Sequence, residues 1–125
     1  MTKILIADDN AQNLYLLETV LKSSGYEVTS AKDGVEAFAS ALKNPPDIIV
    51  TDILMPGMDG FAVVKRLRSQ ERWRDLPIVI VSGAEITDGQ RKSLNTLTQE
   101  FIEKGQFSKE IISSTIKKII YQSPR

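Results

Sequence analysis

The chain of 125 residues contains neither cysteine nor histidine. The absence of cysteine excludes disulfides, thiolate nucleophiles and thiolate metal sites, and it fits a reducing compartment. The absence of histidine excludes catalytic triads built on imidazole, histidine metal ligands and a phosphohistidine carried by this chain. Any step that needs an imidazole must therefore be supplied by another molecule.

The sequence also lacks net charge and long apolar runs. Sixteen basic side chains balance sixteen acidic ones, so the overall charge does not favour nucleic acid or an anionic membrane as a direct partner. No apolar run approaches the ~20 residues that span a bilayer, and the run at residues 4–7 is too short for a signal peptide. We expect a cytoplasmic protein that forms one domain over residues 1–125.

Five short segments have the composition of β-strands. Residues 4–7, 48–50 and 78–81 are nearly continuous runs of isoleucine, valine, leucine and alanine, which is typical of buried parallel strands. Residues 26–30 and Glu100–Glu103 alternate and are more polar, so we expect them at the edges of the sheet.

Helical spacing of apolar residues separates these segments. The predicted faces are Leu14, Leu17 and Leu21; Val35, Phe38, Ala39 and Leu42; Phe61, Val64 and Leu67; and Ile112, Ile116, Ile119 and Ile120. A fourth helix is expected within residues 85–99, and Trp73 is expected to cover the loop before the fourth strand. Alternation of strand and helix predicts an α/β protein with a three-layer α/β/α sandwich, and right-handed crossovers leave few strand orders.

Acidic and polar residues and one lysine follow the ends of four predicted strands: Asp8 and Asp9, Asp52, Ser82 and Lys104. The carboxyl ends of parallel strands open onto one edge of the sheet, so these side chains should converge. Two carboxylates about 4 Å apart repel by roughly 4 kcal/mol at an effective dielectric of about 20. A divalent cation relieves this repulsion, and an all-oxygen site with few carboxylates suits Mg²⁺. We therefore predict Mg²⁺ as the cofactor.

A site of this composition suits a phosphoryl group. The cation and the Lys104 ammonium would neutralise the phosphoryl oxygens, while Ser82 would donate a hydrogen bond to them. Asp52 is the predicted nucleophile because it lies centrally and precedes a loop, whereas Asp8 and Asp9 are adjacent and better placed to hold the metal. The product would be an acyl phosphate.

At these positions the chain resembles the receiver domain of bacterial two-component response regulators of the chemotaxis-regulator type. The resemblance rests on the acidic pair at residues 8 and 9, the run DILMPGMDG at residues 52–60, the turn at residues 82–84 and Lys104. It covers nearly the whole chain. The run at residues 52–60 with three further positions in register is a specific signal.

The resemblance implies a flavodoxin-like fold, with a five-stranded parallel sheet of order 2-1-3-4-5. It implies that Asp52 accepts a phosphoryl group from a histidine kinase or a histidine phosphotransfer protein. Asp9 would ligate Mg²⁺ directly, together with Asp52 and the backbone carbonyl of Leu54, and Asp8 would act mostly through water. Lys104 would hold the phosphate.

The resemblance also implies a conformational switch. Ser82 would move toward the phosphoryl group and Phe101 would turn inward, which would change the surface formed by the fourth helix, fifth strand and fifth helix. That surface would also serve a possible homodimer. The domain would be a signalling module that catalyses only its own phosphorylation and dephosphorylation, and would not be a metabolic enzyme.

Two readings compete with this one, and two features depart from the family. One is that residues 93–99 lack the small Ala-Gly-Ala run that the family commonly has before the fifth strand, and the other is the residue after the lysine. A pseudo-receiver would serve only as a protein-binding scaffold. A flavodoxin-type carrier of flavin phosphate is disfavoured because Asp8 and Asp9 would repel the phosphate. The family usually has proline after the lysine, whereas Gly105 follows Lys104 here; we expect a trans peptide bond, since a cis bond before glycine costs about 3 kcal/mol.

Overall fold

The structure, a computed structural model, describes residues 2–52, 60–82, 87–89, 92, 100–103 and 109–122. Of residues 61, 82, 100–103, 109 and 122 only the backbone is described. Most of the expected fourth helix, within residues 85–99, lies outside the described residues, as does the peptide bond before Gly105.

Strands and helices alternate along the described chain. They are β1 (Lys3–Ala7), α1 (Ala11–Ser23), β2 (Glu27–Ala31), α2 (Gly34–Lys43), β3 (Ile48–Thr51), α3 (Gly60–Arg68), the 3-10 helix η1 (Glu71–Trp73), β4 (Ile78–Ser82), β5 (Glu100–Glu103) and α5 (Lys109–Gln122). All five predicted strands are confirmed to within one residue. None of the helices in the part of the chain described here combines the length and the apolar character needed to cross a bilayer.

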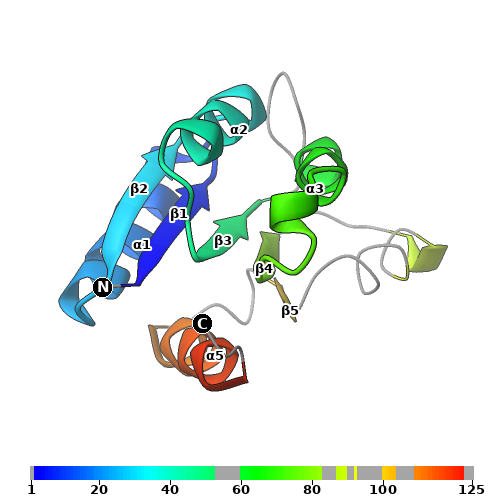
Figure 1. The fold of residues 1–125 in the computed structure, drawn as a ribbon. Coiled ribbons are helices and arrows are strands. Elements are labelled where there is room, and N and C mark those ends of the chain that lie inside the picture. Colours follow the sequence, from blue (N-terminus) through cyan, green and yellow to red (C-terminus); the bar gives the residue numbers. More distant parts are fainter. Residues whose placement is uncertain are drawn as a thin grey trace.

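The five described strands form one sheet in the order β2-β1-β3-β4-β5. Each neighbouring pair is parallel, so all the carboxyl ends lie along one edge. The two polar segments occupy the outer positions, as predicted, while β1, β3 and β4 lie inside (Figure 1). The order of the strands agrees with the flavodoxin-like arrangement that the resemblance implies.

Alternating side chains of the inner strands build two separate cores, one on each face of the sheet. Leu5, Ile49 and Ile78 belong to the core that includes buried residues of α2 and α3. Ile4 and Val50 belong to the core that includes buried residues of α1 and α5. Because a strand directs successive side chains to opposite faces, a continuous apolar run supplies both cores at once. The result is the three-layer sandwich, with α2 and α3 on one side of the sheet and α5 on the other (Figure 1).

Helix α1 is defined by both of its ends. The Asn10 side chain caps the first turn by accepting hydrogen bonds from the backbone N–H groups of Gln12, at 2.9 Å, and Asn13, at 3.1 Å. After the helix, Gly25 has a φ of +92°, a conformation that side chains with a Cβ rarely adopt. Leu17 and Leu21 are buried as predicted. The predicted face of α5 is likewise buried at its isoleucines.

The predicted apolar face of α2 was wrong. The prediction placed Val35, Phe38, Ala39 and Leu42 against the core. Val35 and Leu42 are instead 57% and 48% exposed, and the buried residues are Ala37 and Ala41. Phe38 packs against the core from a half-buried position. Two alanines one turn apart let the helix lie close to the sheet, so the larger side chains remain at its outer surface.

Trp73 was also assigned wrongly, because it lies within the core instead of covering a loop. It is 3% exposed, and its ring meets that of Phe38 edge-on, with centroids 6.2 Å apart and planes at 80°. The guanidinium of Arg72 lies 4.1 Å from the centroid of the Trp73 ring, and that of Arg66 lies 4.9 Å from the centroid of Phe38. Arg68 donates a 2.8 Å hydrogen bond to the Trp73 carbonyl. The charged residues next to Trp73 in the sequence suggested an exposed turn, but the Trp73 side chain itself is buried.

Replacement of Trp73 by alanine is expected to lower the free energy of unfolding by about 3–5 kcal/mol, since a large buried ring leaves a cavity. Urea denaturation followed by circular dichroism measures the loss. Arg72→Ala is the matched control in the same turn, and its loss should stay below about 1 kcal/mol, as for an exposed cation–π contact. Equal losses in the two variants would contradict the assignment of Trp73 to the core.

Candidate functional site

The ends of β1 and β3 lie side by side and fix the position of two aspartates. Ala7 pairs with Thr51 in the parallel register, so Asp8 and Asp52 leave the sheet at the same edge. The Asp52 N–H donates to the Ala7 carbonyl at 2.9 Å. The Asp8 N–H donates to the Ala31 carbonyl of β2 at 3.1 Å. The backbones of Asp8 and Asp52 are thus each held by a hydrogen bond to a neighbouring strand.

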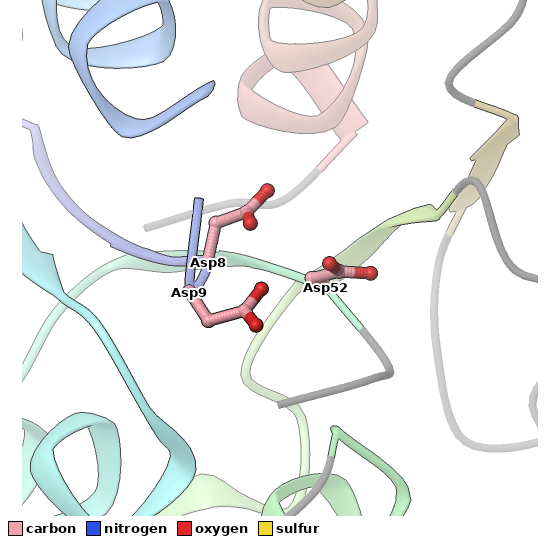
Figure 2. A group of neighbouring side chains, drawn as sticks. All are labelled: Asp8, Asp9 and Asp52. Atoms are coloured by element: carbon pink, nitrogen blue, oxygen red, sulfur yellow. The ribbon is translucent and has the colours of Figure 1, made fainter. Parts of the chain in front are cut away.

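Three carboxylates gather at this edge. Carboxylate oxygens of Asp8, Asp9 and Asp52 all lie within 4.8 Å of one another. Asp8 and Asp52 are buried, with 2% and 6% of their surface exposed, whereas Asp9 is exposed. Figure 2 shows the three side chains where β1 and β3 end. The predicted convergence of the adjacent pair Asp8 and Asp9 with the distant Asp52 is therefore found in the fold.

Such a cluster is electrostatically unfavourable without a counter-charge. At separations near 4 Å and an effective dielectric of about 20, each pair of unit charges repels by roughly 4 kcal/mol. The three residues offer oxygen donors only, and one of them faces solvent. Hard divalent cations such as Mg²⁺ prefer this donor set, and Mg²⁺ commonly keeps several waters. The residues present fit a Mg²⁺ site.

Asp8 has a second, structural role. Its Oδ1 accepts a 2.9 Å hydrogen bond from the backbone N–H of Asn10. Asn10 in turn caps α1, so the turn between β1 and α1 is tied to the acidic cluster at one end and to the helix at the other. Asn10 was not among the predicted site residues. The sequence did carry a signal, since asparagine before an apolar-periodic segment is typical of a helix N-cap.

The remaining predicted residues are placed less completely. Ser82 is the last residue of β4, and Phe101 of β5 pairs with Ile80 of β4. Because Thr51 is level with Ile80, β4 ends at the same edge as the acidic cluster, and the backbone of Ser82 lies there. Leu54 and Lys104 lie outside the described residues, as do the side chains of Ser82 and Phe101.

Thr51 is a further residue that sequence reasoning missed. It is 1% exposed, and its hydroxyl donates a 2.9 Å hydrogen bond to the backbone carbonyl of Asp52. No signal in the sequence distinguishes this threonine from any other β-branched residue that ends a buried strand.

Comparisons with known proteins agree on one family. Residues 4–117 match the response regulator receiver domain family. The response regulator PleD of Caulobacter vibrioides is 37% identical over 102 residues, which is 82% of this chain and 22% of that protein. The chain thus spans about a fifth of the length of this relative.

Solved structures give the same result. The chemotaxis response regulator CheY4 of Vibrio cholerae is 30% identical, with a TM-score of 0.86 over 95% of this chain and 98% of that one. The receiver domain of a sensor histidine kinase from Pseudomonas aeruginosa is 27% identical, with a TM-score of 0.83 over 94% of this chain and 95% of that one. That crystal structure has a magnesium ion coordinated in the active site cleft.

Repulsion within the cluster makes Asp9→Asn informative. In buffer without divalent cations this substitution removes one negative charge, and it should raise the free energy of unfolding by on the order of 1 kcal/mol after allowance for the exposure of Asp9. Addition of 10 mM Mg²⁺ should stabilise the unmodified protein and stabilise the variant less, because binding to the native state adds to stability. Urea denaturation in both buffers measures the two differences.

Asp88→Asn provides the control, since Asp88 is an exposed aspartate outside the cluster. It should leave both the stability in metal-free buffer and the gain with Mg²⁺ unchanged. A variant at Asp9 that is destabilised in metal-free buffer would show that repulsion does not dominate the cluster.

Proposed function

This chain belongs to the response regulator receiver domain family, and we propose on that basis that it receives a phosphoryl group on Asp52. The observation that carries the proposal is the convergence of three carboxylates within 4.8 Å at one sheet edge. Asp52 lies at the end of the central strand β3 of this sheet. Asp52 is 6% exposed, and its carboxylate lies close to those of Asp8 and Asp9.

The proposed reaction is a phosphoryl transfer from a phosphohistidine of a separate protein. A carboxylate oxygen of Asp52 attacks the phosphorus, a P–O bond forms, and the P–N bond to the donor imidazole breaks. The imidazole nitrogen leaves with the electron pair and takes up a proton. Since this chain has no histidine, the donor must be another molecule, and a histidine kinase or a histidine phosphotransfer protein supplies the required group. The product on this chain is an acyl phosphate.

Magnesium fits the proposed site. Asp9 and Asp52 would hold it together with the Leu54 carbonyl, and Asp8 would contribute through water. Bound Mg²⁺ supplies positive charge that stabilises the oxygens of the transferring group. The crystal structure of the similar receiver domain from Pseudomonas aeruginosa, with its magnesium ion in the active site cleft, supports this assignment. The side chains of this protein would orient the nucleophile and keep most of the cluster away from bulk water.

Lys104 and Ser82 complete the proposed site. Strand β5 ends with Glu103, and Lys104 is the next residue in the sequence. Its ammonium would pair with phosphoryl oxygens, and the Ser82 hydroxyl would donate to one of them. Phe101, in the edge strand β5, would turn inward as Ser82 moves toward the phosphate. The change would be read at the surface of the segment before β5, of β5 and of α5, where a homodimer could form.

The proposed role is therefore that of a two-component signalling switch in the cytoplasm. The domain would catalyse its own phosphorylation and dephosphorylation and would turn over no metabolite. The phosphoryl group on Asp52 would add negative charge and shift the equilibrium between two conformations of the same fold.

Asp52→Asn tests the nucleophile. The unmodified protein should gain the mass of one phosphoryl group when incubated with acetyl phosphate and Mg²⁺, and should gain no label when the cation is chelated before the phosphodonor is added. Asp52→Asn should show no labelling, since an amide cannot form the acyl phosphate. Intact-protein mass spectrometry measures the label, and Asp88→Asn should label as the unmodified protein does. An unmodified protein that takes no label under these conditions would leave only a scaffold role.

Lys104→Met separates the lysine from the nucleophile. Methionine keeps an unbranched side chain and removes the charge, so the variant should still accept a phosphoryl group but at a rate reduced about 100- to 1,000-fold, the size of effect typical of one lost electrostatic contact. The rate of acetyl phosphate labelling at saturating Mg²⁺ is the measurement. Lys92→Met, at an exposed lysine elsewhere, serves as the control, and equal rates in the two variants would exclude Lys104 from the site.

A further inference from the structure

Asp52 sits just beyond the last paired residue of β3. Thr51 pairs with Ala7 on one side and with Ile80 on the other, and these are the last pairs of the two ladders among the described residues. The Asp52 N–H is still held by β1 through its 2.9 Å bond to the Ala7 carbonyl. Its carbonyl group lies where the chain leaves the sheet, and it accepts a hydrogen bond from a side chain.

The Thr51 side chain provides this contact. Its hydroxyl donates to the Asp52 carbonyl at 2.9 Å, and the whole interaction is buried. Thr51 itself is 1% exposed. A buried hydroxyl and a buried carbonyl that satisfy each other hold their geometry strongly, because water cannot replace either partner.

We propose that Thr51 is a positioning residue for the nucleophile: its hydroxyl fixes the backbone of Asp52 and thereby aims the Asp52 carboxylate. This inference rests on the proposed function of Asp52 and deepens it. With the N–H bound to β1 and the carbonyl bound to Thr51, both ends of the Asp52 residue are held, and the direction of its Cα–Cβ bond follows. The orientation of the peptide bond that leads into residue 53 follows as well.

The position of the carboxylate matters because of the chemistry required of it. In-line attack on phosphorus needs the oxygen in a narrow range of distance and angle, and small misplacements of a reacting group reduce rates steeply. The same carboxylate must also share a cation with Asp8 and Asp9, whose oxygens lie within 4.8 Å. A rotation of the Asp52 backbone would alter both relations at once.

Three variants separate the hydroxyl from the rest of the side chain. Thr51→Val keeps the shape and removes the hydroxyl, whereas Thr51→Ser keeps the hydroxyl and removes a methyl group. Thr29→Val is the matched control, because Thr29 is a half-buried threonine of β2 that pairs with Leu5, away from the edge with the cluster. Urea denaturation of each variant records the loss of stability, so that effects on rate are compared among folded proteins.

The first measurement is the rate of Mg²⁺-dependent labelling by acetyl phosphate at saturating donor. Thr51→Val should label about tenfold more slowly with an unchanged half-saturating donor concentration, while Thr51→Ser and Thr29→Val should stay within about twofold of the unmodified protein. A Thr51→Val variant that is less stable but labels at the normal rate would reduce Thr51 to a structural residue and overturn the inference. Equal slowing by valine and serine would also overturn it.

The second measurement needs no phosphodonor. Calorimetric titration with Mg²⁺ should give at least threefold weaker binding in Thr51→Val and near-normal binding in Thr51→Ser. If the unmodified protein takes no label, the proposed function fails. The Mg²⁺ titration still tests the role of Thr51 in that case, because unchanged Mg²⁺ affinity in Thr51→Val would refute that role. If Thr51→Val does not fold, NMR of the unmodified protein decides: the Thr51 hydroxyl proton should exchange slowly with water, and fast exchange would overturn the proposal.

Discussion

The site depends on parallel pairing of β1 with β3. That register places Ala7 opposite Thr51, so the residues that follow them leave the sheet together and their carboxylates meet. The repulsion between these groups works against the fold, and the sheet must hold them in spite of it. Backbone hydrogen bonds from Asp52 to Ala7 and from Asp8 to Ala31 do so at the point where the strain is greatest. The carboxylates are therefore brought together by the backbone of the sheet itself.

The two hydrophobic cores hold the sheet on which the acidic cluster lies. The two cores take alternate residues of the inner strands, and each also includes buried residues of the helices on its face of the sheet. Trp73, whose ring packs edge-on against that of Phe38, comes shortly before β4 in the sequence, whereas Ser82 is the last residue of that strand.

Comparison of sequence and structure shows where pattern reasoning succeeds. The strands were predicted because long apolar runs have few alternatives to burial in a parallel sheet. The face of α2 was predicted wrongly because hydrophobicity alone ranked Val35 and Leu42 above the alanines that make the closest approach. Trp73 was missed because charged neighbours surround it in sequence, although only its own side chain points inward. In both cases the tertiary packing decided which side chains are buried, and no local pattern in the sequence encodes that packing.

The sequence by itself determined the parallel α/β class, the five strands and the identity of the acidic residues at their ends, because these follow from short-range composition and periodicity. It also pointed to the family through the run at residues 52–60. Only the tertiary structure decided how near the three carboxylates lie and which of them are buried. It also decided that the Thr51 hydroxyl donates to the Asp52 carbonyl and that the Asn10 N–H donates to the Asp8 carboxylate. The physical reason is that distances between residues far apart in the chain are set jointly by strand register and by the helices packed on the sheet.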